Sequence, residues 1–146
     1  ELTRSRRYHH PLSLLIVELE KGRYKYKREN LDGLQTDLLQ RFAVARVGQI
    51  ISEGARETDL ILRDRSGRFI LLCPETDFER SVIFGERIRK AVAEHMDTEV
   101  VWSSASFPDE ALTFDELIER AEQRLAQPDP AAAKSIPVQA EEQQLK

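Results

Sequence analysis

The sequence has few of the residues that disulfide-rich, metal-binding or membrane architectures require. Its 146 residues include a single cysteine, Cys73, with six glycines and six prolines. One cysteine excludes a disulfide or a cysteine-based metal site within the chain, and its place in an apolar run predicts a buried thiol in a reducing compartment. No apolar run approaches the ~20 residues that a membrane-spanning helix needs, and the first residues carry no signal-peptide pattern. We therefore expect no membrane contact by this chain.

A strong excess of charge of one sign is also missing. The formal net charge is −4, although 33% of the residues are charged. There is no global reason to expect DNA or an anionic membrane as a partner, so an anionic ligand would need a local cluster of arginines. Because 40% of the residues are hydrophobic, the chain is long and apolar enough for one domain with its own core.

The two ends of the sequence differ from this domain. Glu1 rather than methionine stands first, and we expect a piece of a longer protein with regulatory or membrane regions before it. Residues 128–146 are rich in Ala, Gln, Glu and Pro and have almost no large apolar residues. That composition predicts a tail or linker, which leaves residues 1–127 as the domain.

Apolar periodicity and turn signals predict alternating strands and helices. Capping boxes at Thr76 with Glu79 and at Thr113 with Glu116 predict the starts of the last two helices. This order favours an α/β sandwich with a ferredoxin-like or polymerase-palm β-α-β-β-α-β core and a central, mainly antiparallel sheet flanked by helices. The strands are expected at 11–20, 59–64, 68–74 and 98–107, and the helices at 1–10, 31–54 (one helix or two joined ones), 77–95 and 114–127.

Three stretches, in this order and at this spacing, resemble the GGDEF family of diguanylate cyclases. The opening ELTRSRRYHHPLSLLIVELE is similar to that family's leading helix and first strand. RETDLILRDRSGRFILLCPETDFERSVIFGERIRKAV is similar to its signature hairpin and following helix, and SSASFPDEALTFDELIERAEQRL to its last strand and helix. The resemblance covers most of residues 1–127 and implies a bacterial domain with a nucleotidyl-cyclase-like palm, facing the cytoplasm.

The resemblance also implies an active site that this chain has lost. Active members condense two GTP molecules into cyclic di-GMP with a Gly-Gly-Asp-Glu-Phe turn, which reads RSGRF here, at residues 65–69. Magnesium needs oxygen ligands, and Arg68 is a permanent cation without an acceptor atom. The first strand's aspartates correspond to Glu18 and Glu20, which we expect to pair with an arginine. The family's nucleotide-selecting Asn and Asp have no counterpart in residues 21–40. We expect no cyclase activity, no catalytic residue, no metal and no cofactor.

A second site of the family has counterparts in this sequence. Arg56 and Asp59 form an RxxD motif, with five residues between Asp59 and the altered turn. This spacing matches the inhibitory site where the family's product, cyclic di-GMP, binds. Arg87 aligns with a second arginine of that site, and Arg4 with a position from which a neighbouring domain adds another. An arginine fork can engage O6 and N7 of guanine, and a carboxylate can accept from its N–H groups. The resemblance therefore implies a cyclic di-GMP site at these residues.

Three functions remain open on this interpretation. The first, which we favour, is a catalytically inactive cyclic di-GMP receptor that bridges two copies, or docks on a protein partner or an N-terminal regulatory region. The second is a ligand-free interaction or dimerisation scaffold that has lost both sites, since Arg56 and Asp59 also fit an ordinary surface ion pair and Arg87 an exposed helical residue. The third is GTP binding or residual turnover at Glu18 and Glu20.

Overall fold

The computed structural model describes residues 10–20 and 33–127, the first four of the second range by their backbone alone. The expectations for residues 1–9, including Arg4, for residues 21–32 and for the tail at 128–146 lie outside the described residues. Within the described part, no helix is long and apolar enough to cross a membrane.

Four strands form one antiparallel sheet in the order β2-β3-β1-β4. The central strand β1 has all of its residues buried except Glu18, because helices cover both faces of the sheet. Its near-continuous apolar run predicted such a strand. The strands are β1 (Leu12–Leu19), β2 (Leu60–Arg63), β3 (Phe69–Pro74) and β4 (Val100–Phe107).

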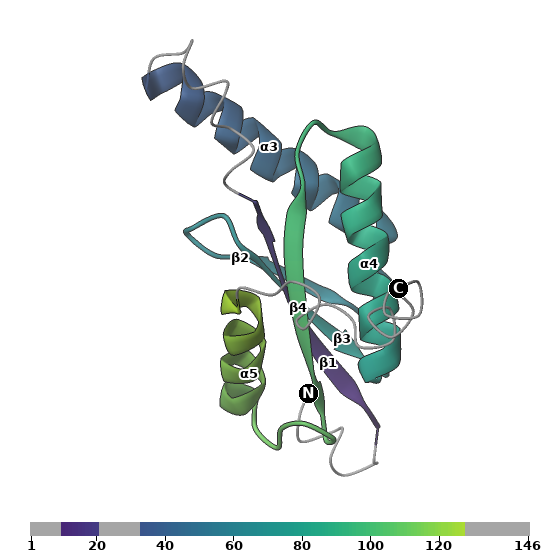
Figure 1. Cartoon of the computed structure of the whole chain (residues 1–146). Helices are drawn as coiled ribbons and strands as arrows, with labels where there is room; N and C mark the ends of the chain where they lie inside the picture. The colour runs from purple at the N-terminus through teal and green to yellow at the C-terminus, as the bar shows by residue number, and fades with distance from the viewer. Residues whose placement is uncertain (1–9, 21–32, 128–146) are drawn as a thin grey trace, which may run out of the picture.

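Three helices flank this sheet: α3 (Gly33–Gly54), α4 (Phe78–His95) and α5 (Phe114–Ala126). α3 is a single continuous helix. Side chains of α3 and α4 form a core with Leu15 and Val17 of β1, whereas α5 packs on Leu14 and Ile16, which point to the opposite face. Figure 1 shows α4 and α5 on opposite sides of the sheet. This arrangement confirms the predicted ferredoxin-like α+β fold.

One of the two predicted capping boxes is wrong. Thr113 caps α5 as expected, with its hydroxyl accepting from the Glu116 amide at 3.1 Å. α4 is instead capped by Asp77, whose carboxylate accepts from the Arg80 amide at 2.9 Å. The hydroxyl of Thr76 accepts from Arg56 instead.

α4 approaches β4 very closely at Gly85. A Cβ atom placed on Gly85 would lie 2.5 Å from a ring carbon of Trp102. Trp102 is buried, as its position in a predicted strand indicated, and its indole N–H donates to Glu86 at 3.1 Å. The absence of a side chain at Gly85 therefore lets the indole pack directly against the helix backbone.

Candidate functional site

The predicted ligand residues of the described chain meet in one hollow. It has a volume of about 230 Å³ and lies where the end of α3 and the start of β2 meet the first turns of α4. We call it the RxxD pocket. Its lining includes Arg56, Asp59, Thr76, Arg80, Ile83 and Arg87. The structure thus brings together the RxxD motif and the second arginine.

The RxxD motif forms a turn in which the side chain of Asp59 bonds back to Arg56. The carboxylate of Asp59 accepts from the backbone amide of Arg56 at 2.8 Å and from its Nη2 at 3.3 Å. The Asp59 side chain is only 3% exposed, whereas that of Arg56 is 53% exposed. In this conformation Asp59 holds Arg56 in place by hydrogen bonds. A direct hydrogen bond from guanine to the Asp59 carboxylate would require that carboxylate to become exposed.

Arg56 is also tied to the end of β3. Its Nη2 donates to the Pro74 carbonyl at 2.6 Å and to the Thr76 hydroxyl at 2.7 Å. Among the described residues, every side-chain hydrogen bond of Arg56 uses Nη2, so a bidentate fork to guanine would compete with these bonds. Nε, Nη1 and the exposed plane of the guanidinium remain for single hydrogen bonds and for stacking.

The first three turns of α4 supply the other cations. Arg80 and Arg87 are seven residues apart, so they lie on the same face of the helix. Arg87 donates to the Gly54 carbonyl at 3.5 Å and lies 5.7 Å from the centroid of the Phe84 ring. Sequence reasoning missed Arg80, although its two-turn spacing from Arg87 is a usable signal. The lining thus has three arginines and one carboxylate, which makes the RxxD pocket positive.

Cys73 lies beneath this pocket. It is buried, as the sequence predicted. Burial raises the pKa of its thiol to about 12, and the negative charge of Asp59 adds to the rise. The thiol therefore stays protonated at neutral pH and does not act as a nucleophile.

The altered signature turn is stabilised by hydrogen bonds to Asp64, a residue of the same hairpin. Asp64 accepts from the amide and the hydroxyl of Ser66 at 2.9 and 2.7 Å, and from the amide of Arg68 at 3.1 Å. Gly67 adopts φ of 88°, the left-handed conformation that its place in a tight turn predicted. Phe69 is 4% exposed and packs in the core, in agreement with a packing role for the last residue of the pentapeptide.

The ion pairs of Arg68 differ from the expected ones. Its guanidinium bonds to Asp64 at 2.9 Å and to Glu122 at 3.3 Å, rather than to Glu18 or Glu20 as we had expected. Asp64 lies in the same hairpin and Glu122 on α5, which covers this side of the sheet. Among the described residues, no group of three or more His, Cys, Asp or Glu side chains could hold a metal ion. The paired guanidinium of Arg68 offers no oxygen ligand to magnesium.

Asp64→Asn should destabilise the domain at neutral pH and much less in acid. Burial alone would raise the pKa of Asp64, but hydrogen bonds from Ser66 and Arg68 outweigh it and hold that pKa below 3.8. Because the folded-state pKa is the lower one, this stabilisation is complete above the unfolded-state pKa and is lost as pH falls through the folded-state value. We expect a loss of about 1–2 kcal/mol at pH 7 in urea unfolding. A loss that stays equal as pH is lowered, down to the most acidic pH at which the domain still folds, would contradict this account.

A hollow of about 610 Å³ lies between this turn and α3. Its lining is mainly basic, with Arg41, Arg63 and Arg65, but it also includes Asp37. Asp37 accepts from Nε of Arg41 at 3.0 Å. Sequence reasoning gave no role to Asp37 because no motif marks it, yet α3 places it beside the turn.

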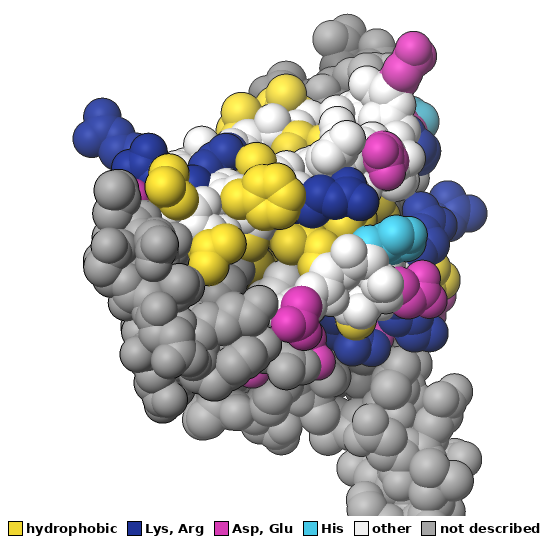
Figure 2. All heavy atoms as spheres, turned by 90° about the horizontal axis from the view of Figure 1, so that it is seen from above, with side chains coloured by type: hydrophobic (Ala, Val, Ile, Leu, Met, Phe, Trp, Pro, Cys, Tyr) yellow, Lys and Arg dark blue, Asp and Glu magenta, His cyan; other side chains and the backbone are white. Residues whose placement is uncertain are grey.

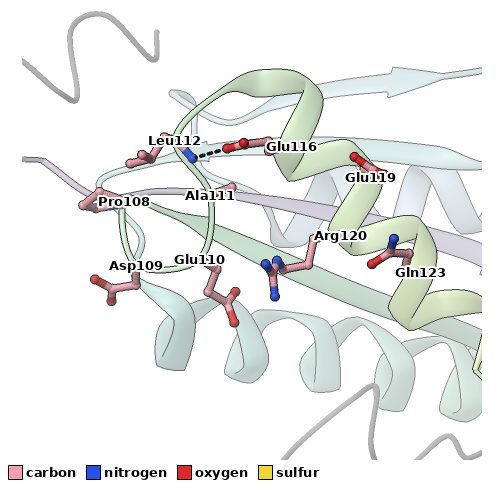
Figure 3. Close-up of a pocket in the computed structure, with 9 residues that line it drawn as sticks. All are labelled: Pro108, Asp109, Glu110, Ala111, Leu112, Glu116, Glu119, Arg120 and Gln123. Atoms are coloured by element: carbon pink, nitrogen blue, oxygen red, sulfur yellow. Dashed lines mark hydrogen bonds between the residues drawn. The ribbon is translucent and has the colours of Figure 1, made fainter.

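A further hollow of about 590 Å³ lies between the β4–α5 loop and α5 (Figure 3). Glu116 there accepts from the backbone amide of Leu112 at 2.7 Å. The excess of carboxylates disfavours an anionic ligand. Its charged lining residues are Asp109, Glu110, Glu116, Glu119 and Arg120.

α3 also exposes an apolar surface. Leu38, Leu39 and Phe42 are exposed, and a groove of about 420 Å³ runs from Leu39 and Phe42 to His95 and Met96. Figure 2 shows hydrophobic side chains gathered on the surface beside basic ones. Exposed apolar patches of this kind are typical of protein interaction surfaces.

No protein-family model and no curated protein matches this sequence. Solved structures do match. The active GGEEF domain of a diguanylate cyclase from Vibrio cholerae aligns with a TM-score of 0.70 and 17% identity, covering 84% of this chain and 79% of that one. A DGC protein from Thermotoga maritima aligns with a TM-score of 0.67 and 17% identity over 86% of each chain. The coiled coil and GGDEF domain of DgcB from Caulobacter crescentus, in complex with c-di-GMP, aligns with a TM-score of 0.66 and 16% identity, covering 85% and 67%.

The chain therefore has the fold of the GGDEF domains of diguanylate cyclases, as the sequence resemblance predicted. Sequence identities of 16–17% establish the fold alone. The function has to be argued from the residues of this chain.

Proposed function

We propose that this domain is a catalytically inactive receptor of GGDEF fold that binds cyclic di-GMP in the RxxD pocket. The observation that carries the proposal is the convergence of Arg56, Asp59 and Arg87 on one hollow, although they come from separate segments of the chain. With Arg80 the lining holds three cations, which suit a ligand with two phosphates. The hollow beside α5 is acidic and disfavours this ligand. The hollow between the altered turn and α3 is also basic, but it contains none of Arg56, Asp59 and Arg87.

The lining also suits a purine base. The guanidinium of Arg56 is half exposed and offers a plane on which a base can stack. Ile83 is 60% exposed and lies on the same face of α4, where it adds apolar surface. Arg80 and Arg87 flank that residue and are placed to meet phosphate or the polar edge of guanine.

The pocket is small for the whole ligand. Its volume of about 230 Å³ lies below the roughly 300–1,000 Å³ of pockets that enclose a drug-sized molecule. Part of a cyclic dinucleotide would therefore stay outside it and meet another surface. This favours a ligand that bridges two copies or joins the domain to a partner or an N-terminal region, and Arg4 would contribute from that side.

The altered turn supports the absence of catalysis. Arg68 is held by Asp64 and Glu122 at the place where the family's turn supplies a metal carboxylate. Two carboxylates that would otherwise be free to attract magnesium are thereby neutralised. We expect no conversion of GTP to cyclic di-GMP.

A ligand-free interaction scaffold is the second candidate. The exposed Leu38, Leu39 and Phe42 favour it, because soluble domains rarely expose neighbouring large apolar side chains without a partner. Receptor and scaffold make opposite predictions for a titration with nucleotide.

Calorimetric titration of the domain with cyclic di-GMP tests the proposal, with GTP plus magnesium run in parallel. We expect saturable binding of cyclic di-GMP that weakens as salt is raised, because the contacts are mainly ionic. Binding of neither nucleotide would overturn the receptor and leave the scaffold. Formation of cyclic di-GMP from GTP would overturn the claim of inactivity.

Arg87→Ala should weaken cyclic di-GMP binding by about 10- to 100-fold, because a hydrogen bond to a charged group contributes about 1.5–3 kcal/mol. Arg89→Ala is the matched control, since it removes the same charge two residues later in the same helix. Arg89 bonds to Glu86 at 2.9 Å and does not line the RxxD pocket. Equal losses for the two variants in the same titration would show a general charge effect rather than a site.

A further inference from the structure

We propose that Thr76 is a positioning residue for Arg56, and that the corner at Pro74, Glu75 and Thr76 holds the exposed plane of this arginine ready for stacking and single hydrogen bonds with the ligand. We call these three residues the β3 corner. The inference rests on the proposed function of the RxxD pocket and adds a residue that no motif of that site includes.

The hydrogen bonds around the Thr76 hydroxyl form a closed triangle. Nη2 of Arg56 donates to the Thr76 hydroxyl at 2.7 Å and to the Pro74 carbonyl at 2.6 Å. The hydroxyl in turn donates to the same carbonyl at 3.1 Å. Thr76 is 6% exposed, so its hydroxyl needs partners inside the protein, and the triangle satisfies both its donor and its acceptor capacity.

The backbone of the β3 corner adopts an uncommon conformation at Glu75. Glu75 has φ of 58°, and it is the one non-glycine residue in the described chain with a positive φ. Such a conformation persists where the surroundings fix it. Here the amide of Glu75 donates to the Pro11 carbonyl at 2.9 Å, and the hydroxyl of Ser13 donates to the Thr76 carbonyl at 2.7 Å. The corner is thereby anchored on the start of β1.

The hydroxyl of Thr76 is not required for helix capping. Asp77 caps α4 with its own carboxylate, which leaves Thr76 free for another role. A half-exposed arginine would otherwise sample many rotamers, and ordering it on binding would reduce affinity. The β3 corner removes part of that cost before the ligand arrives.

Thr76→Val tests the role of the hydroxyl because valine keeps the size and the branching of the side chain. We expect Thr76→Val to bind cyclic di-GMP about three- to tenfold more weakly, the range that corresponds to one freed side chain. Thr76→Ser keeps the hydroxyl and should restore binding to within about twofold of the wild type. Thr98→Val is the matched control: Thr98 is buried, its hydroxyl has no hydrogen-bond partner among the described residues, and it lies away from the RxxD pocket. The Thr98→Val variant should bind cyclic di-GMP with the affinity of the wild type.

Nitrogen-15 NMR of the Arg56 guanidinium separates the positioning role from the ligand. Slow rotation about the bond from Cζ to Nη2 is expected in the wild type, and faster rotation in Thr76→Val. If the wild type does not bind cyclic di-GMP but rotation is faster in Thr76→Val, the positioning role of Thr76 is supported and the proposed receptor function is wrong. If the wild type and Thr76→Val bind cyclic di-GMP equally well, the role of Thr76 is overturned. It is also overturned if the rotation about the bond from Cζ to Nη2 of Arg56 is the same in both proteins.

Discussion

Arg56→Ala is expected to abolish measurable binding of cyclic di-GMP, with a loss of affinity of about 100-fold or more, or about 3 kcal/mol. The substitution removes a cation and a stacking plane from the ligand's side of the pocket. It also removes the charged partner of Asp59, whose side chain is 3% exposed, although the backbone amide of residue 56 still donates to that carboxylate. A carboxylate left there without its guanidinium would draw in water or a cation and change the shape of the site. Calorimetric titration at constant salt measures the loss.

Arg63→Ala is the matched control for this experiment. Arg63 is an exposed arginine of β2 that lines the hollow beside the altered turn and not the RxxD pocket. Its removal changes the net charge by the same amount and should leave the affinity within about twofold, since surface charges at a distance are screened by salt. Circular dichroism shows whether each variant is folded. Wild-type affinity in a folded Arg56→Ala variant would show that the ligand does not use this pocket.

Gly85→Ala is expected to destabilise the domain by about 2–3 kcal/mol, because extra atoms in a packed core force side chains and backbone apart. Alanine favours helix over glycine by about 1 kcal/mol, so the expected direction is opposite to the one that helix propensity gives. The new Cβ would lie 2.5 Å from the ring of Trp102. Trp102 is 2% exposed, so its indole has no open space into which to move. Urea unfolding followed by tryptophan fluorescence measures the change.

Gly54→Ala provides the comparison. A Cβ on this glycine would have Phe84 as its nearest neighbour, at an ordinary contact distance of 4.0 Å. We expect a change in the free energy of unfolding of at most about 0.5 kcal/mol. Similar stabilities for the two variants would mean that α4 can move away from β4 without cost, and that the close approach at Gly85 is not a constraint.

The fold could be predicted well because its signals are local. The apolar run of β1 indicated a strand buried on both faces, and apolar residues at helical spacing indicated α3, α4 and α5. The choice between one helix and two in residues 31–54 could not be made from periodicity, since both give the same pattern. The capping signal at Thr76 misled because a hydroxyl has two uses, and only tertiary contacts decide between them.

The lining of the RxxD pocket, the proposed site, could be predicted in part. Arg56 and Asp59 were found because their spacing is a motif, and Arg87 because the resemblance extends into α4. Arg80 and Thr76 were missed because each has an ordinary local explanation, as an exposed helical residue and as a helix cap. The partners of Arg68 were wrongly assigned because the packing of α5 against the hairpin cannot be derived from either segment alone. The low exposure of Asp59 likewise depends on the surrounding chain.

The β2–β3 hairpin carries the RxxD motif at one end and the altered turn at the other. Asp59 and Asp64 are five residues apart, which at ~3.3 Å per residue corresponds to roughly 16 Å. Substitutions separated by more than about 10 Å usually contribute independently. The two ends of one hairpin can therefore evolve independently. Mutations can accumulate in the turn and abolish catalysis there, while selection continues to maintain the residues at the other end.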